Sequence, residues 1–250
     1  MRSTTDACGC FPSGRHYPGI AHLLKVAIVG LAEEWPADTA WLDLPIAMLD
    51  TETTGRDAAT DRIVELGIII GRGGEITDRK NWLINPGIPI PKAASDVHHI
   101  TDDDVRDAPR LAELAEEILG VLAEAVPAAY NAGFDRGFLM EELRRAGVAT
   151  TRAAVPAVRA GVEWLDPLVW ARSIQRYEKG RTLGDVAGRL GISLENAHRA
   201  SDDAEAALRV MYAFARDASV PATYGGLIQE QRRLARVQEE DFRKWRKNKP

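Results

Sequence analysis

Three short apolar segments in the first third of the chain most constrain its fold. They cover Pro45–Asp50, Ile63–Gly71 and Ile76–Ile84, and only the turn Arg72–Glu75 separates the last two. Apolar runs of this length that are bounded by turn residues are typical of strands, and so short a connection favours a hairpin. The sequence therefore predicts a three-stranded antiparallel meander at the start of the folded domain.

Helices and strands alternate in the part of the chain that follows. Leucine, isoleucine and alanine recur every three or four residues over Leu111–Leu122, which gives a helix one apolar face. We expect further strands at Val126–Tyr130 and Val162–Leu165, and further helices at Phe134–Ala146, from Pro167, at Thr182–Leu190 and at Ala200–Arg216. The expected fold class is thus α/β, with a mixed five-stranded sheet of three antiparallel strands and then parallel ones, flanked by helices.

Both ends of the chain differ from this core domain, which we expect at residues 45–218. Residues 1–44 form an N-terminal extension, partly disordered, with one helix expected at His22–Glu34. Residues 219–250 form a C-terminal helix or tail, and the stretch 225–250 carries eight Lys or Arg against four acids. Two interpretations stay open for this tail, a helix docked on the domain or a basic arm that binds nucleic acid or a protein partner.

Composition excludes several classes of protein. The formal net charge of −5 argues against a protein that binds duplex nucleic acid by charge alone. Cys8 and Cys10 are the only cysteines, so a disulfide framework is excluded, and this usage fits a reducing, cytoplasmic location. No apolar run reaches the length of a membrane span, and no membrane partner is expected.

The most conspicuous polar motif is Asp50-Thr-Glu-Thr-Thr-Gly55, directly after the first apolar strand. Alternate residues of a strand point the same way, so Asp50 and Glu52 project together. Two carboxylates so close repel each other unless cations lie between them, and Mg²⁺ or Mn²⁺ prefers such oxygen ligands. Taken alone, however, this pattern is also that of a strand end with solvated acids.

Two more motifs supply acids at positions that can meet the first. Asp135 follows another apolar strand within Asn131-Ala-Gly-Phe-Asp135, where it either caps the next helix or joins a metal site. His198 precedes Asp203 by five residues, at the start of the last core helix. A histidine so placed can accept a proton from water, although a single histidine is more often structural.

Together these motifs resemble the DEDDh family of 3′–5′ exonucleases, the DnaQ-like group that includes the proofreading subunit of bacterial DNA polymerase III and ribonuclease T. The D-x-E motif matches Asp50 and Glu52, the second motif matches Asp135, and H-x-x-x-x-D matches His198 and Asp203. Val97–Asp103 also resembles a loop of the proofreading group. Arg199 stands where a second subclass of the family has tyrosine, four residues before the last acid.

The resemblance implies a ribonuclease-H-like fold and hydrolysis of phosphodiester bonds from a 3′ end, with nucleoside 5′-monophosphates as products. It implies two divalent ions, Mg²⁺ or Mn²⁺, held by the four carboxylates, and His198 as general base. The same resemblance implies that Thr51, Thr53 and Phe134 hold the terminal nucleotide and that Asn131 contacts the strand. His99, Ile100 and Thr101 would then lie beside the scissile nucleotide.

Three alternatives remain at this point. The Val97–Asp103 segment favours single-stranded DNA as substrate, but an enzyme that trims RNA 3′ ends, like ribonuclease T, fits the same motifs. A second alternative is a non-catalytic module, against which the retention of all five motif residues argues. The third is a subunit docked on a polymerase or replisome through its basic tail.

Overall fold

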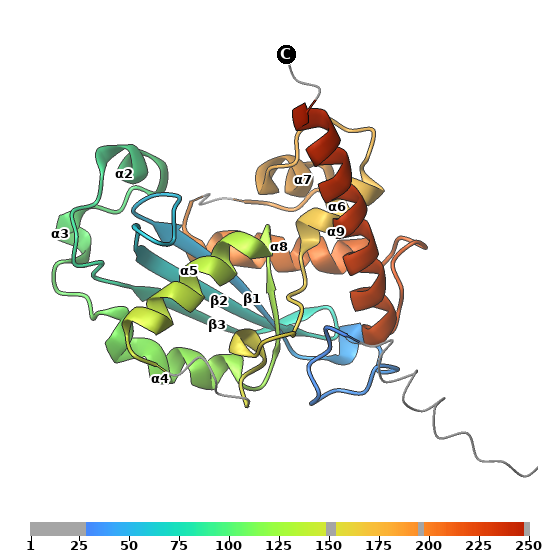
Figure 1. Cartoon of the computed structure of the whole chain (residues 1–250), viewed down its shortest axis with the longest axis horizontal. Helices are drawn as coiled ribbons and strands as arrows, with labels where there is room; N and C mark the ends of the chain where they lie inside the picture. The colour runs from blue at the N-terminus through green and yellow to red at the C-terminus, as the bar shows by residue number, and fades with distance from the viewer. Residues whose placement is uncertain (1–28, 149–153, 195–197, 248–250) are drawn as a thin grey trace, which may run out of the picture.

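The computed structural model describes residues 29–148, 154–194 and 198–247 and contains a sheet with helices on both faces (Figure 1). Within these residues the sheet has four strands in the order β3-β2-β1-β4. β1 pairs antiparallel with β2 and β2 with β3, whereas β4 runs parallel to β1. The expected α/β class and the antiparallel meander are therefore confirmed. The strand bounds are β1 (Ile46–Thr53), β2 (Ile63–Arg72), β3 (Glu75–Leu83) and β4 (Val126–Ala129).

Most helices lie close to the segments where the sequence predicted them, whereas the two short helices α2 and α3 were not expected. Short 3₁₀ turns, η1 (Trp41–Asp43) and η2 (Pro156–Val158), precede β1 and follow α5. The Asp166 side chain caps α6 by accepting the Leu168 N–H, and Thr182 begins α7 in a capping box with Asp185. The helices are α2 (Lys92–His98), α3 (Asp102–Val105), α4 (Leu111–Leu122), α5 (Ala132–Arg145), α6 (Pro167–Ile174), α7 (Leu183–Arg189), α8 (Ala200–Phe214) and α9 (Tyr224–Lys247).

Strand β1 is buried on both faces, which explains its continuous apolar sequence. Ile46 and Met48 pack in one core with residues of α6, α7, α8 and α9. Ala47 and Leu49 point the other way into a second core with α4 and α5. Because the side chains of a strand alternate, Asp50 and Glu52 continue the α8 side, and Thr51 and Thr53 continue the α5 side.

The expected fifth strand at Val162–Leu165 is wrong, and Pro127 explains why. In the described residues this segment makes a single parallel bridge to β4, in which Leu165 N–H donates to the Pro127 carbonyl at 2.9 Å and Ala129 N–H donates to the Leu165 carbonyl at 3.0 Å. The next bond of a parallel ladder needs an N–H at Pro127, which proline lacks. The N–H of Glu163 donates instead to the Gly30 carbonyl at 2.8 Å, so the pairing ends after one bridge.

The expected helix at His22–Glu34 is wrong for its described part, because residues 29–34 form turns and irregular backbone. Gly30 has φ +109°, a conformation incompatible with an α-helix. The segment packs against the start of α9, where Ala32 N–H donates to the Tyr224 hydroxyl at 3.0 Å. Residues 22–28, like Cys8 and Cys10, lie outside the described residues.

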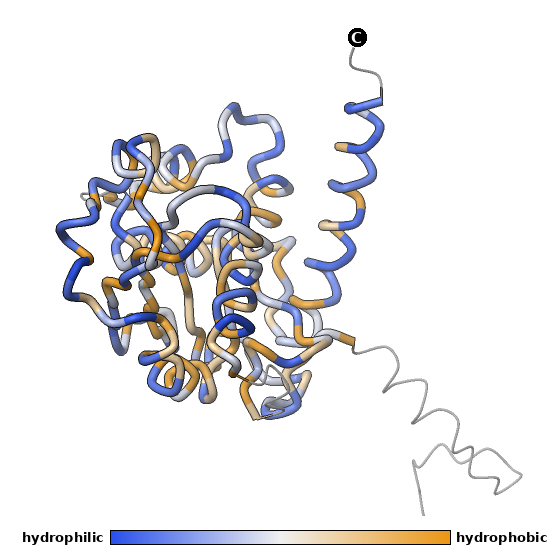
Figure 2. Tube along the Cα trace, turned by 60° about the vertical axis from the view of Figure 1, so that its left-hand side comes forward, coloured by the Kyte–Doolittle hydropathy of each residue, from blue (hydrophilic) through white to orange (hydrophobic). Residues whose placement is uncertain are grey.

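Helix α9 has a buried half and an exposed half. Tyr224, Leu227, Ile228 and Gln231 are buried against the domain, as the docked-helix interpretation of the tail requires. The second half is mostly exposed, and its mostly hydrophilic trace carries a few hydrophobic positions (Figure 2). α9 is long but rich in charge, and among the described residues no helix combines the length and hydropathy needed to cross a membrane.

Candidate active site

Asp50 and Glu52 lie near the end of β1, beside the N-terminal turns of α5 and α8. Burial raises the pKa of Asp50 well above its usual range, and the negative charges of Asp135, Asp203 and Glu52 raise it further. Burial raises the pKa of Glu52 to about 8, again with the help of neighbouring acids, Asp203 first among them. The expected pair of carboxylates therefore belongs to a larger acidic cluster, whose mutual repulsion outweighs the opposing charge of Arg199 at Glu52.

Asp135 enters this cluster from the first turn of α5 and is only 3% exposed. Its Oδ1 accepts a hydrogen bond of 2.8 Å from the Thr51 hydroxyl of β1, which fixes the carboxylate against the strand. Burial raises its pKa to about 7 in spite of this bond. Asp166 holds the turn before the helix, since it accepts the N–H groups of Asn131 at 3.0 Å and Ala132 at 3.1 Å.

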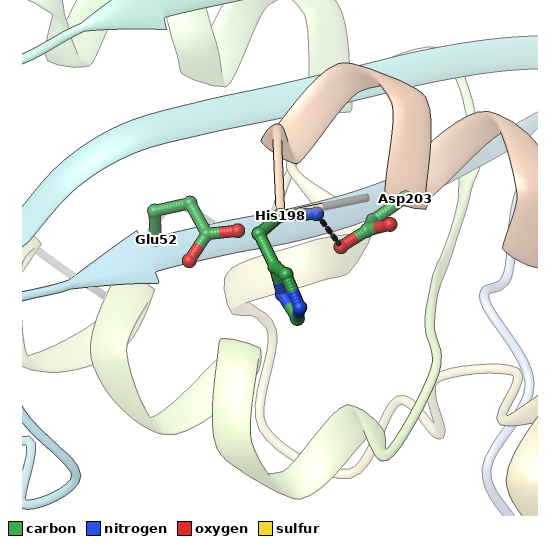
Figure 3. A group of neighbouring side chains, drawn as sticks. All are labelled: Glu52, His198 and Asp203. Carbon is green, nitrogen blue, oxygen red and sulfur yellow. Dashed lines mark hydrogen bonds between the residues drawn. The ribbon is translucent and has the colours of Figure 1, made fainter. Parts of the chain in front are cut away.

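His198 and Asp203 come from the start of α8. The backbone N–H of His198 donates to Asp203 Oδ2 at 3.1 Å (Figure 3). Asp203 Oδ1 is buried and has no hydrogen-bond partner among the described residues. Candidate ligand atoms of Glu52, His198 and Asp203 all lie within 4.8 Å of one another. An unsatisfied carboxylate oxygen in such a cluster is what a hard divalent cation would neutralise.

Two features of β2 hold the start of α8 in this position. The buried Glu65 accepts hydrogen bonds from Arg199 Nη2 at 2.6 Å and from the Ala200 N–H at 3.0 Å. Gly67 pairs with Asp50, and the backbone of Ala200 and Ser201 lies directly over it, so this position has no room for a side chain. The partner of Glu65 at the start of α8 and the role of Gly67 depend on contacts between distant segments, which the sequence alone does not indicate.

A groove of about 370 Å³ opens beside the acids, between the end of β1 and α2. Thr51, Thr53 and Phe134, three of the expected substrate contacts, line it together with Glu52. The expected substrate contacts did not include the rest of this lining, of which Val97 and His98 belong to the segment Val97–Asp103, because no local signal brings α2 against the end of β1. These additional residues are Thr54, Gly55, Arg56, Pro91, Ala93, Ala94, Val97 and His98.

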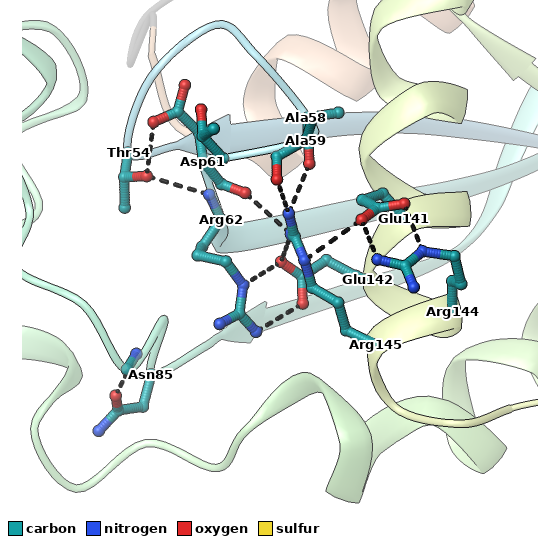
Figure 4. Close-up of polar contacts among 12 residues, drawn as sticks. Thr54, Ala58, Ala59, Asp61, Arg62, Asn85, Glu141, Glu142, Arg144 and Arg145 are labelled. Carbon is teal, nitrogen blue, oxygen red and sulfur yellow. Dashed lines mark hydrogen bonds and ion pairs between the residues drawn. The ribbon is translucent and has the colours of Figure 1, made fainter.

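The loop that follows β1 is clamped from below by Arg145 of α5 (Figure 4). Arg145 donates to the carbonyls of Ala58 at 2.7 Å, Ala59 at 2.8 Å and Asp61 at 2.9 Å. Its guanidinium also pairs with the buried Glu142, whose other partner is Arg62. The clamp fixes the path of the chain next to Gly55 and Arg56, and therefore one wall of the groove.

The remaining expected substrate contacts lie outside the groove lining. Asn131 adopts a left-handed conformation at the start of α5, with φ +70°. His99, also left-handed, ends α2, and Thr101 begins α3 in a capping box with Asp104. Ile100 is buried in a small apolar cluster with Ile90 and Val105. Whether these residues touch a substrate stays a prediction.

Comparison with known proteins identifies similar sequences and folds. The family model RNase_T, described as exonuclease, matches residues 47–211. The PolC-type DNA polymerase III of Streptococcus suis is 31% identical over 182 residues, which cover 73% of this chain and 12% of the relative. The corresponding enzyme of Thermotoga maritima is 30% identical over 181 residues, covering 71% and 12%. The chain thus spans only about an eighth of the length of these relatives.

Solved structures of nucleases share the fold. The complex of Escherichia coli exonuclease I with single-stranded DNA superposes with a TM-score of 0.61 at 19% identity, covering 71% of this chain and 42% of that chain. Exonuclease X in complex with 5′ overhanging duplex DNA gives a TM-score of 0.57 at 21% identity, covering 74% and 99%. At these identities the likeness concerns the fold.

Proposed function

The chain belongs to the exonuclease family, and on that premise we propose that it hydrolyses single-stranded DNA from the 3′ end, releasing nucleoside 5′-monophosphates. The observation that carries the proposal is the convergence of Asp50, Glu52, Asp135 and Asp203 from three separate elements, with His198 beside them. Four acids do not gather by chance at the end of a buried strand, because each is costly to bury without a compensating charge.

The residues of the cluster fit divalent metal ions. All four acids offer carboxylate oxygens, the donors that Mg²⁺ and Mn²⁺ prefer, and one oxygen of Asp203 is buried without a partner among the described residues. Asp50, whose pKa is raised by the charges of the other three acids, would hold both ions. Glu52 and Asp203 would complete one ion site, and Asp135 would support the other. When bound, two such ions would activate water and offset the charge that develops on the phosphodiester.

The protein side chains would then divide the remaining work. His198 is exposed beside Glu52 and Asp203, where it would take the proton of the attacking water. Thr51 would keep Asp135 oriented through its 2.8 Å hydrogen bond. Phe134 and Thr53 line the groove and would hold the terminal nucleotide by stacking and hydrogen bonding. The nucleic-acid strand would also contact four residues outside the groove lining, namely Asn131, His99, Ile100 and Thr101.

Relatives and structural neighbours support DNA as the substrate and a replication context. The relatives are PolC-type DNA polymerases, and neighbours were solved with single-stranded or overhanging DNA. A role beside a polymerase, in the cytoplasm, is part of the proposal. RNA is the second candidate, because a 3′-exonuclease that recognises a histone mRNA stem-loop has the same fold, with a TM-score of 0.59 at 15% identity.

A degradation panel tests the proposal. Single-stranded DNA, duplex DNA and RNA of equal length are each incubated with Mg²⁺ or Mn²⁺, and Asp203→Ala serves as the inactive control. We expect fastest loss of nucleotides from the 3′ end of single-stranded DNA and no hydrolysis by the variant, although the variant stays folded. Faster hydrolysis of RNA would favour the second candidate, and equal activity of Asp203→Ala would refute the site.

A further inference from the structure

A second groove, of about 560 Å³, lies between α6 and the exposed half of α9. None of its lining residues belongs to the carboxylate cluster. We call it the α6–α9 groove, and its size suits a nucleotide-sized ligand. It is lined by Val169, Arg172, Ala235, Gln238, Glu239, Asp241, Phe242 and Trp245.

Two exposed aromatic rings form one wall of the α6–α9 groove. Phe242 is 53% exposed and Trp245 is 55% exposed. Their rings stack with centroids 5.6 Å apart and planes inclined by 19°, and the Arg246 guanidinium lies 4.7 Å from the Phe242 centroid. An exposed aromatic stack beside a cation is the kind of platform on which nucleobases stack.

The α6–α9 groove also offers an unused hydrogen-bond acceptor. Gln238 Nε2 donates to the Val169 carbonyl at 2.9 Å, which fixes the amide. Gln238 Oε1 is buried and has no partner among the described residues. A buried acceptor without a donor is costly, so a ligand that brings an N–H group would gain from this position. The ring N–H of a pyrimidine is such a donor.

The charges around the aromatic stack favour a ligand with phosphates. The last six described residues of α9, 242–247, hold Arg243, Lys244, Arg246 and Lys247 and no acid. Arg172 lines the opposite side, on α6. Of the two acids in the lining, Asp241 is paired with Lys244 at 3.5 Å. A chain of bases and phosphates therefore complements both the rings and the cations.

Helix α6 connects this groove to the carboxylate cluster. Asp166 caps α6 and binds the N–H groups of Asn131 and Ala132 at the start of α5, the helix that carries Asp135. α6 has eight residues, and a helix of that length spans about 12 Å. A strand whose 3′ end lies at the carboxylates can therefore extend along α6 to reach the aromatic stack.

We propose that the α6–α9 groove binds a base of single-stranded nucleic acid upstream of the 3′-terminal nucleotide. The inference rests on the proposed exonuclease function and adds a substrate site to it. The base stacks on Trp245 and Phe242 and donates a hydrogen bond to Gln238 Oε1. The neighbouring phosphates lie near Arg172 and the basic end of α9. A short substrate that does not reach the groove gains nothing from it.

Truncation of the aromatic stack tests this proposal. The double variant Phe242→Ala/Trp245→Ala is compared with Tyr177→Ala, which removes an aromatic ring that is 85% exposed and lies outside the groove lining. The short substrate is the dinucleotide of thymidine, which cannot extend along the eight residues of α6. The long substrate is an oligothymidylate of about 16 nucleotides, the upper end of the range that one single-strand-binding fold covers. The p-nitrophenyl ester of thymidine 5′-monophosphate serves as a minimal substrate that contacts only the cluster.

The double variant is expected to raise KM for the long oligothymidylate about tenfold, equivalent to about 1.4 kcal/mol. KM for the dinucleotide and for the ester should stay unchanged, as should every value of Tyr177→Ala. Equal losses on all three substrates would overturn the proposal, because the rings would then act through the stability of the domain.

Direct binding keeps this test independent of catalysis. Fluorescence anisotropy of a 5′-labelled long oligothymidylate, measured with EDTA, should show a similar tenfold weakening in the double variant. Unchanged affinity would overturn the inference and favour a protein partner for the groove. If the wild type binds the oligothymidylate through the groove but hydrolyses no substrate, the proposed function fails while the groove assignment stands.

Discussion

Gly67→Ala is the substitution that most directly perturbs the assembly of the site without touching its acids. Gly67 pairs with Asp50 across β1 and β2. A Cβ at this position would lie 2.5 Å from the Ala200 carbonyl oxygen, where ordinary contacts begin at 3.4 Å. The obstacle is backbone, which has no alternative rotamer, so the first turn of α8 must move by about 1 Å. Asp203 lies on that turn and moves with it.

Two magnitudes follow from this displacement. Overpacking of this kind typically costs about 1–3 kcal/mol of unfolding free energy. A displacement of about 1 Å at a catalytic group can cost about 100-fold in rate. We therefore expect a folded variant that melts at a lower temperature and whose kcat falls by about two orders of magnitude, a larger effect than the stability loss alone explains.

The two effects are measured separately. Circular dichroism monitors thermal unfolding, and hydrolysis of the p-nitrophenyl ester gives kcat. Gly120→Ala is the matched control, because a Cβ there meets no atom within 4 Å and alanine favours the helical conformation at this exposed position of α4. That control should keep full activity and gain stability. Wild-type kcat in a folded Gly67→Ala protein would refute the argument that α8 must approach β2 this closely.

Two further predictions concern charge. In metal-free protein, Glu52 has its pKa raised to about 8 from 4.5, so its contribution to stability is unfavourable above pH 8 and this penalty disappears as pH falls toward 4.5. Glu52→Gln should raise the unfolding free energy at about pH 9 by at least about 1.4 kcal/mol. Mg²⁺ should reduce this difference between the variant and the wild type. A variant that melts at a lower temperature than the wild type would contradict the prediction. Glu65→Gln should lower kcat more than it raises KM, because Arg199 and Ala200 lose the anion that positions His198. The same variant should lower the free energy of unfolding by about 1–2 kcal/mol, a modest loss because Arg199 is half exposed. Asp78→Asn, which removes an exposed pair with Lys80, is its control and should leave kinetics unchanged.

The sequence predicted the elements whose signals are local. The apolar segment before Asp50, the hairpin of β2 and β3 and the periodic helices α4 and α8 all lie where residue patterns placed them. Helices α6 and α7 likewise begin close to where the sequence placed them, after the caps Asp166 and Thr182, because a helix start depends on neighbouring residues. The acids of the cluster could be predicted from the sequence because each follows or begins such an element.

Features that depend on distant contacts escaped the sequence. The fifth strand ends after one bridge because Pro127 lacks an N–H and Glu163 bonds to Gly30, a partner more than a hundred residues away. Similarly, Gly67 reads as an ordinary strand glycine until α8 is placed over it. The groove wall formed by α2 and the exposed rings of α9 also become visible only when helices are packed in three dimensions.

Product analysis on a single-stranded oligonucleotide tests whether the four carboxylates support metal-dependent hydrolysis from the 3′ end. An oligonucleotide labelled at its 3′-terminal nucleotide is incubated with the protein and Mn²⁺, beside Asp50→Asn and an EDTA control. We expect the labelled nucleoside 5′-monophosphate to appear first, and neither Asp50→Asn nor the EDTA sample to release it. Release of internal fragments, of a 3′-monophosphate, or of the same product by Asp50→Asn would contradict the assignment of these carboxylates to metal-dependent 3′–5′ hydrolysis.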